Sequence, residues 1–125
     1  MKKKELIVTI ISILVVAVVV IWAGAKSGTG GKYDAFASCI AESGTEFYGA
    51  FWCPHCQAQK KAFGSSQKLL PYIECSTPDG QGQLEICTEK GIEGYPTWIF
   101  PDGERLSGEV ELDILAEKTS CELPQ

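Results

Sequence analysis

Residues 46–61 read EFYGAFWCPHCQAQKK, and the expected architecture of the protein follows from them. Phe47–Trp52 is a short apolar run rich in aromatic residues, which is typical of a buried strand. A Cys-x-x-Cys pair follows at once, and its Pro54 stands where a fixed φ angle suits the first turn of a helix. Residues 57–62 are good helix formers. The stretch therefore predicts a buried strand that leads into a Cys-x-x-Cys pair at the start of a helix.

This placement makes a chemical prediction about the two sulfurs. A thiol at a helix N-terminus meets unpaired N–H groups and the positive end of the helix dipole, which both favour the thiolate of Cys53. His55 can add positive charge or a hydrogen bond to that thiolate. Cys56 lies three residues on and can close a disulfide with Cys53. We therefore predict Cys53 as the exposed attacking sulfur and Cys56 as the buried resolving one, with Pro54 and His55 completing the catalytic motif.

The N-terminus predicts a membrane anchor. Met1–Lys4 is basic, and Leu6–Ala25 carries no charge. About 20 apolar residues suffice to cross a bilayer as a helix, and a nearby lysine cluster stays on the cytoplasmic side. The competing interpretation is a cleaved signal peptide, because Ala23-Gly24-Ala25 fits the small-residue cleavage pattern. We expect a single-pass protein of the cell membrane. Residues 1–25 are then a basic cytoplasmic start followed by the transmembrane anchor, and the domain is periplasmic or extracellular.

The remaining residues divide into a linker and one domain. Residues 26–32 are rich in glycine and predict a flexible tether. Residues 33–125 are expected to form the folded domain, and they hold fifteen of the sixteen acidic residues of a chain whose net charge is −5. Such acidity argues against nucleic acid or anionic lipid as a partner of the domain.

Helical and strand patterns alternate along the predicted domain. Glycine and proline punctuation and apolar periodicity separate the segments. Helices are expected at 33–43, 83–90 and 110–119, and a further helix is expected to run from the Cys-x-x-Cys pair to about residue 63. Expected strands are 45–52, 71–75, 97–100 and 105–107, the last two joined by a hairpin turn at 101–104. The sequence predicts an α/β fold with a mixed sheet flanked by helices on both faces.

Six cysteines in a small exported domain indicate an oxidising compartment. If Cys53 and Cys56 are the redox pair, four cysteines remain. Cys75 and Cys87 bracket a turn-rich loop that a disulfide would staple. The pairing Cys39–Cys121 then follows by exclusion, and all four are expected to be structural. The rival interpretation is that Cys75–Cys87 relays electrons to a partner.

The motifs now in hand resemble the thioredoxin superfamily. They are the strand that leads into Trp52 and the Cys-x-x-Cys pair, the following helix, and the segment GIEGYPT at 91–97. The resemblance implies a thioredoxin-like fold in which Pro96 is cis and faces the two active-site cysteines. It also implies that the backbone of Tyr95 meets an extended substrate. We expect Trp52 on the rim of the same site, with a place in the core as the alternative.

A narrower resemblance covers nearly all of residues 33–123. The segments YGAFWCPHC, YIEC, ICT and GYPTW resemble, in order, the thioredoxin-like domain fused to bacterial homologues of vitamin K epoxide reductase. The tetrapeptide Cys-Pro-His-Cys is also that of the periplasmic oxidase DsbA. The implied role is oxidation of thiols in cysteine-containing protein substrates, with electrons passed to a membrane reductase and its quinone. Since this chain has one apolar segment and no reductase bundle, that partner would be a separate polypeptide.

One departure from the family concerns the proton of Cys56. Thioredoxin and DsbA carry a buried carboxylate six residues before the first cysteine, and Phe47 takes that position here. Glu46 is adjacent but is expected to face the other side of the strand. Glu46, water and the substrate all remain candidates for the proton acceptor.

Two other functions compete with a dithiol oxidase. A disulfide reductase or isomerase would use the same fold and the same cysteines. A non-enzymatic copper-binding module would use the two cysteines and His55. A zinc site usually needs four ligands, and the chain has one Cys-x-x-Cys pair and one histidine. The sequence therefore predicts no resident metal and no cofactor beyond the redox disulfide.

Overall fold

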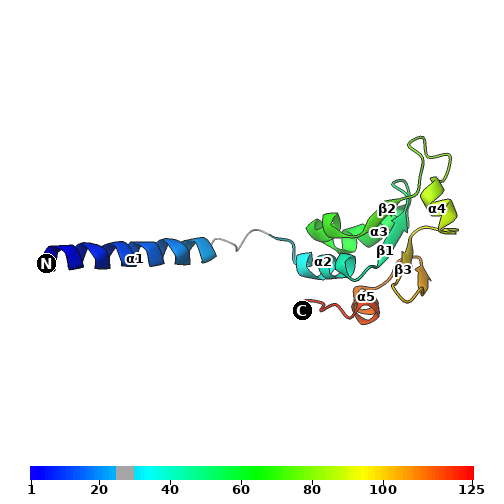
Figure 1. Ribbon diagram of the computed structural model, residues 1–125. Coiled ribbons are helices and arrows are strands. Elements are labelled where there is room, and N and C mark those ends of the chain that lie inside the picture. Colours follow the sequence, from blue (N-terminus) through cyan, green and yellow to red (C-terminus); the bar gives the residue numbers. More distant parts are fainter. Residues whose placement is uncertain (25–29) are drawn as a thin grey trace. The chain divides into compact units, whose positions relative to one another are not determined.

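The computed structural model describes residues 1–24 and 30–125, with the backbone alone for residues 22–24. It divides into two compact units, residues 1–30 and 31–125, which are treated separately below (Figure 1). Most of the predicted tether at 26–32, namely residues 26–29, lies outside the described residues, as does Ala25 of the small-residue pattern.

The first unit is one helix, α1 (Lys2–Gly24). The described side chains of this helix, up to Ile21, are all exposed, and those after Glu5 are mainly valine, isoleucine and leucine. By length and composition the helix qualifies as a membrane span, and a signal sequence near the N-terminus passes the same test.

The second unit contains short helices and strands in nearly the predicted order. The elements are α2 (Asp34–Glu42), β1 (Glu46–Gly49), α3 (Pro54–Ala62), the 3₁₀ helix η1 (Gly64–Leu69), β2 (Tyr72–Glu74), α4 (Glu85–Glu89), β3 (Thr97–Ile99), β4 (Arg105–Ser107) and α5 (Leu112–Thr119). The strand predicted to reach Trp52 ends at Gly49, because the chain turns before the helix. The 3₁₀ helix η1 was not predicted from the sequence, and Val110 precedes α5 instead of starting it.

The four strands form one mixed sheet in the order β2-β1-β3-β4. β1 pairs in parallel with β2 and antiparallel with β3, and β3 pairs antiparallel with β4. The parallel register places Gly49 opposite Glu74 and Phe47 opposite Tyr72. The prediction of an α/β fold with a mixed sheet is confirmed.

Successive residues of β1 bury opposite faces of the sheet. Phe47 stacks on Trp98 with ring centroids 4.2 Å apart, in a core that also holds side chains from α2, α5 and the end of α3. Tyr48 lies in a second cluster with Cys75, Cys87 and Ile92, on the side covered by α4. Helices therefore cover both faces, which leaves the loops after β1 and before β3 to build a site at one edge.

Two disulfides brace this arrangement. Cys39 in α2 is bonded to Cys121, which follows α5, and Cys75 after β2 is bonded to Cys87 in α4. Both pairings were expected from the sequence. The remaining two cysteines, Cys53 and Cys56, are free thiols.

Candidate active site

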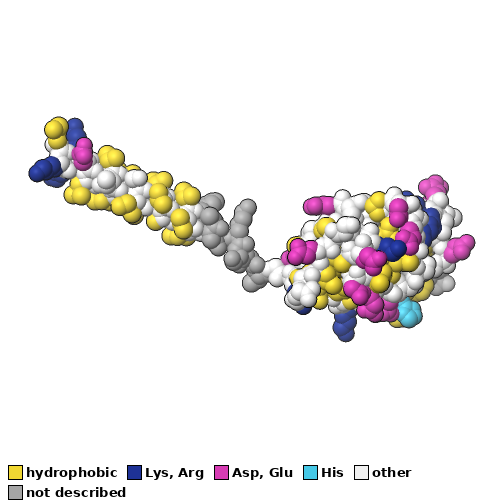
Figure 2. Space-filling view, turned by 90° about the horizontal axis from the view of Figure 1, so that it is seen from below, with side chains coloured by type: hydrophobic (Ala, Val, Ile, Leu, Met, Phe, Trp, Pro, Cys, Tyr) yellow, Lys and Arg dark blue, Asp and Glu magenta, His cyan; other side chains and the backbone are white. Residues whose placement is uncertain are grey.

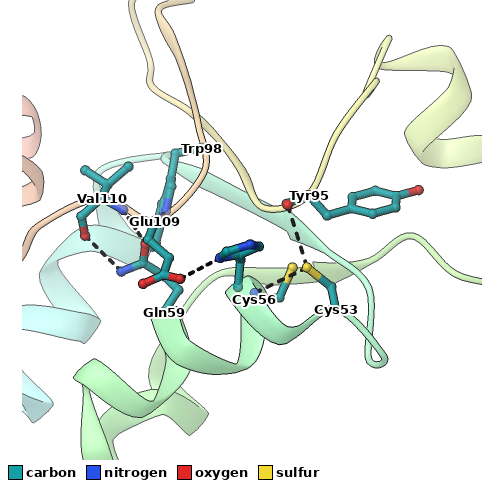
Figure 3. A network of polar contacts seen from close by, with 8 residues as sticks. Cys53, Cys56, Gln59, Tyr95, Trp98, Glu109 and Val110 are labelled. Carbon is teal, nitrogen blue, oxygen red and sulfur yellow. Dashed lines mark hydrogen bonds and ion pairs between the residues drawn. The ribbon is translucent and has the colours of Figure 1, made fainter.

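The two free thiols lie at the start of α3. Cys53 is the N-cap residue, with φ −78° and ψ 119°, and Pro54 occupies the first turn. The backbone N–H of Cys56 donates to Cys53 Sγ at 3.4 Å (Figure 3). The first sulfur thus takes the place that an N-cap oxygen usually takes, and it satisfies one of the unpaired N–H groups of the helix.

The sequence prediction that Cys53 is exposed is wrong. Its side chain is 5 % exposed, and that of Cys56 is 1 % exposed. Both belong to a small buried cluster with Ala50, against which Tyr95 packs. Cys53 is slightly more exposed than Cys56, but the site is much more enclosed than the sequence predicted.

The segment before β3 closes the site opposite the cysteines. The Tyr95–Pro96 peptide bond is cis, as the resemblance implied. The Cys53 thiol donates to the Tyr95 carbonyl oxygen at 3.6 Å, an interaction drawn in Figure 3. The backbone ahead of Pro96 is therefore in direct contact with the first sulfur.

Aromatic side chains form the rim of the site. Trp52 is 48 % exposed and meets the Tyr95 ring edge-on, with centroids 5.9 Å apart. The indole N–H of Trp52 donates to Ser76 Oγ at 2.8 Å, and Gln83 Nε2 donates to the Tyr95 hydroxyl at 2.7 Å. Ser76 and Gln83 were not singled out from the sequence, since nothing local marks a residue that holds an aromatic ring from a distant loop.

His55 does not contact a sulfur through a hydrogen bond in the described residues. Its Nδ1 lies 2.8 Å from Glu109 Oε1, and the two side chains are 71 % and 49 % exposed. In Figure 2 the only histidine of the chain stands beside acidic side chains at the surface. Of the two roles expected for His55, a hydrogen bond to the thiolate is not formed in the described residues, and the ring bonds to Glu109 instead.

Gln59 is a buried polar residue one turn beyond the cysteines, and it was not predicted from the sequence as a site residue. Its Nε2 donates to the Val110 carbonyl at 3.0 Å, while Oε1 accepts from Val110 N–H at 2.6 Å and from Trp98 Nε1 at 3.4 Å (Figure 3). The amide thereby fixes α3 to the segment before α5 and to β3. Its only sequence signal is a polar residue on an otherwise inward face of a helix.

The environment of the second sulfur strongly favours its neutral form. Burial raises the pKa of the Cys56 thiol to about 12, and the hydrogen bond and charge of Cys53 act in the same direction. The backbone of Ala50 and the charge of Lys60 act against this rise. Both sulfurs are buried, but that of Cys53 accepts a hydrogen bond at the helix N-cap, whereas that of Cys56 lies in surroundings that raise its pKa.

Known proteins that resemble this chain are thiol-disulfide oxidoreductases and related thioredoxin-domain proteins. A thiol-disulfide oxidoreductase of Arabidopsis thaliana, LTO1, is 47 % identical over 96 residues, which cover 73 % of this chain. A thioredoxin domain-containing protein 5 homolog of Drosophila melanogaster is 29 % identical over 84 residues, or 58 % of the chain. A protein disulfide-isomerase of Arthroderma benhamiae is 35 % identical over 71 residues, or 53 % of the chain. The domain is thioredoxin-like.

The match to these relatives covers only part of each of them. The aligned regions make up 25 %, 19 % and 13 % of the three relatives in the order given. No family model matches the chain. The likeness therefore concerns the thioredoxin-like domain and not the whole length of these relatives.

Two features of this thioredoxin-like domain bear on the chemistry left open by the sequence. Glu46 faces away from Phe47 and pairs with Lys90, with Oε2 and Nζ 2.8 Å apart. Among the described residues, no group of three His, Cys, Asp or Glu side chains is placed to hold a metal ion. Glu46 therefore lies on the face of β1 that carries Tyr48, away from the core around Phe47.

Proposed function

We propose that the protein is a membrane-anchored, extracytoplasmic thiol-disulfide oxidoreductase that acts through a Cys53–Cys56 disulfide. The observation that carries the proposal is the pair of free thiols at the start of α3, with the Cys53 sulfur in contact with the carbonyl before a cis proline. The printed name of the Arabidopsis relative supports the same reaction class. No cofactor is needed in the domain, because the disulfide itself carries the two electrons.

The proposed reaction runs through a mixed disulfide. A substrate thiolate attacks Cys53 Sγ in the oxidised pair, the Cys53–Cys56 bond breaks, and Cys56 leaves as a thiolate that takes up a proton. A second substrate thiolate then attacks the substrate sulfur of the mixed disulfide. The substrate disulfide forms, and Cys53 leaves as a thiolate. The pair has gained the two electrons that the substrate lost.

We further propose that the net direction is oxidation of cysteine-containing protein substrates. The N-cap position of Cys53 supports this direction, because an N–H donor and a helix dipole that face its sulfur stabilise the reduced pair and make the disulfide a better oxidant. A quinone-linked membrane reductase of the vitamin K epoxide reductase type would reoxidise the pair. The support for this separate partner is the sequence resemblance described above.

Anchoring by α1 is the proposed reason why the domain works at a membrane. The helix is long and apolar enough to span a bilayer, and its lysines lie at the N-terminal end. With those lysines in the cytoplasm, the domain lies on the outer side, where disulfides persist. The two structural disulfides are consistent with such a compartment.

Activity of the purified full chain in detergent tests the proposal. The oxidised protein is mixed with a reduced peptide that contains two cysteines, and formation of the peptide disulfide is followed by mass. Cys53→Ser is expected to abolish turnover, and Cys56→Ser is expected to accumulate mixed disulfides that survive non-reducing gels. Cys39→Ala/Cys121→Ala is the control, because that disulfide lies away from the site. Normal turnover in either active-site variant would reject the mechanism.

A second candidate is a disulfide reductase or isomerase, favoured by the name of the Arthroderma benhamiae relative, a protein disulfide-isomerase. A redox titration of the Cys53–Cys56 pair separates the two directions. A reduction potential near that of thioredoxin, about −270 mV, favours a reductase, and a clearly higher potential favours an oxidase.

A further inference from the structure

The proposed reaction requires a proton partner for Cys56, and the following inference rests on that function. Cys56 has to lose its proton to attack a mixed disulfide at Cys53, and it has to regain a proton when it is expelled. Burial makes the anion costly at this position. Phe47 stands where the family has a carboxylate, and Glu46 pairs with Lys90 on the other face.

Gly49 marks the space beside the buried sulfur. A Cβ atom built on Gly49 would lie 3.0 Å from Cys56 Sγ, 2.8 Å from Tyr72 Cε2 and 3.3 Å from the Tyr72 hydroxyl. The sulfur and the phenol therefore approach the same point above β1. A side chain at Gly49 would occupy the space between the Cys56 sulfur and the Tyr72 ring.

A carboxylate lies directly behind that phenol. The Tyr72 hydroxyl donates to Glu74 Oε2 at 2.8 Å. The other carboxylate oxygen accepts from the backbone N–H of Phe51 at 3.1 Å and of Ser76 at 2.9 Å. Three donors thus fix the orientation of the Glu74 carboxyl group beside the site, and its place is set by the parallel pairing of Gly49 with Glu74.

Lys60 completes the charged surroundings of Cys56. It lies one helical turn after Cys56, and its Nζ is 3.2 Å from the centroid of the Tyr72 ring. Burial lowers the pKa of Lys60, whereas the charges of Glu74 and Cys56 raise it. The titratable groups that face Cys56 from the packed elements are therefore Cys53 and Lys60 of α3 and Tyr72 and Glu74 of β2.

We propose that Tyr72 and Glu74 form the proton relay of Cys56, in place of the buried carboxylate that this strand lacks. When Cys56 resolves a mixed disulfide, its proton passes to the Tyr72 oxygen while the Tyr72 hydroxyl proton passes to the Glu74 carboxylate. Cys56 Sγ then attacks Cys53 Sγ, the new disulfide forms, and the substrate sulfur leaves as a thiolate. In the oxidising direction the same path returns the proton to Cys56. Lys60 holds the Tyr72 ring in place and stabilises the transient thiolate.

The two thiols can be followed separately in one experiment. The reduced full chain in detergent is mixed in a stopped-flow instrument with an aromatic disulfide reagent whose released thiolate absorbs visible light. The first release reports the attack of Cys53 on the reagent, and the second reports the attack of Cys56 on the mixed disulfide. Both rates are measured across pH in the wild type, Glu74→Gln and Tyr72→Phe.

The relay predicts an effect on the second rate alone. Glu74→Gln keeps an oxygen for the Phe51 and Ser76 N–H groups but accepts no proton, so the second release is expected to slow by about tenfold or more and to shift to higher pH. Tyr72→Phe is expected to do the same. The double variant is expected to match either single variant, because the two groups act in series.

The matched control is Glu46→Gln. Glu46 is also a glutamate of the sheet, but it pairs with Lys90 on the other face of β1, so this variant is expected to leave both rates unchanged. A wild-type second rate and pH profile in a folded Glu74→Gln variant would overturn the relay while leaving the proposed function intact. Loss of the first release in the wild type itself would instead contradict the proposed function.

Discussion

Gln59 shows how one buried side chain can connect three parts of a small domain. Its amide is 2 % exposed and bonds both the N–H and the C=O of Val110, as well as the Trp98 indole. A buried amide with every partner in place rigidifies its surroundings, and one without them is costly. The helix that begins at Cys53 is therefore held in register with β3.

Replacing Gln59 with leucine is expected to lower the free energy of unfolding by about 3 kcal/mol, since it leaves two backbone groups of Val110 and the Trp98 N–H unpaired in the core. Chemical denaturation of the full chain in detergent measures this. Gln57→Leu is the control, and it is expected to cost less than about 1 kcal/mol because the Phe51 carbonyl that Gln57 bonds is exposed to water. Equal losses in the two variants would contradict the assignment.

Cys56 makes the stability of the reduced protein depend on alkaline pH. Burial raises its pKa from the ordinary value of 9.0 to about 12, so between these values the folded state keeps a proton that the unfolded state has released. The free energy of unfolding is therefore expected to fall as pH rises from about 9 towards 12. Burial also raises the pKa of Tyr72, which acts in the same direction.

Urea unfolding of the reduced full chain at several alkaline pH values tests this dependence. Cys56→Ala is expected to flatten the decline, with the residual slope due to Tyr72 and other alkaline groups. Identical pH profiles of the wild type and Cys56→Ala would show that the Cys56 thiol ionises as easily in the folded protein as in the unfolded chain.

At the scale of elements, the loop between Cys75 and Cys87 supports the rim of the site. Ser76 holds the Trp52 indole and Gln83 holds the Tyr95 hydroxyl, and the disulfide joins the two ends of this loop. Gly80 also approaches the rim, because a Cβ there would lie 3.6 Å from the Trp52 ring. The staple thus acts on two aromatic residues that flank the first sulfur.

Removing this staple is expected to weaken substrate binding as well as the fold. Cys75→Ala/Cys87→Ala should lower the free energy of unfolding by about 3 kcal/mol for its 12-residue separation. It should also raise KM for a dithiol peptide about fivefold, the equivalent of one lost rim hydrogen bond, with kcat nearly unchanged. Peptide oxidation kinetics measure this difference.

The second disulfide supplies the control for the rim. Cys39→Ala/Cys121→Ala is expected to cost about 4.5 kcal/mol, because its cysteines are 82 residues apart, yet to leave KM unchanged in the folded fraction. If both double variants raised KM alike, the effect would come from general loosening of the domain and not from the rim.

At the scale of the whole molecule, retention or cleavage of α1 decides whether the protein is anchored in a membrane or exported in soluble form. The exposed apolar side chains of this helix have no partner within the described part of the chain, which fits insertion into a bilayer. Val15→Arg/Val18→Arg is expected to disfavour insertion by about 5 kcal/mol or more, since each arginine at the helix centre costs about 2.5–3.5 kcal/mol.

Alkaline carbonate extraction of cell membranes checks the anchor. The wild type is expected to stay in the membrane pellet at its full mass, and the double arginine variant to be lost from it. Ile114→Arg, on the surface of α5, is the control and is expected to behave as the wild type. A soluble wild-type chain shortened near residue 25 would identify the segment as a cleaved signal.

Local rules were sufficient to predict most of the elements and the two sulfurs. Alternation of apolar residues, the proline after Cys53 and the glycines after helices act through neighbours in the chain, so the order of helices and strands could be read in advance. β4 was predicted at its observed bounds, whereas β1 was predicted too long. The apolar residues Ala50, Phe51 and Trp52 continue the strand pattern in the sequence, but they lie in the loop at the active site and pair with no strand.

The sequence by itself determined the α/β class, the Cys-x-x-Cys pair at a helix start, the apolar N-terminal helix and the two structural disulfides. Only the tertiary structure decided what surrounds the sulfurs: the near-burial of Cys53, the pairing of His55 with Glu109, and Tyr72 and Glu74 beside Cys56. The reason is physical. Burial and charge depend on groups brought together by sheet register and helix packing from 16 residues apart (Cys56 and Tyr72) to 54 residues apart (His55 and Glu109), and no local preference specifies those distances.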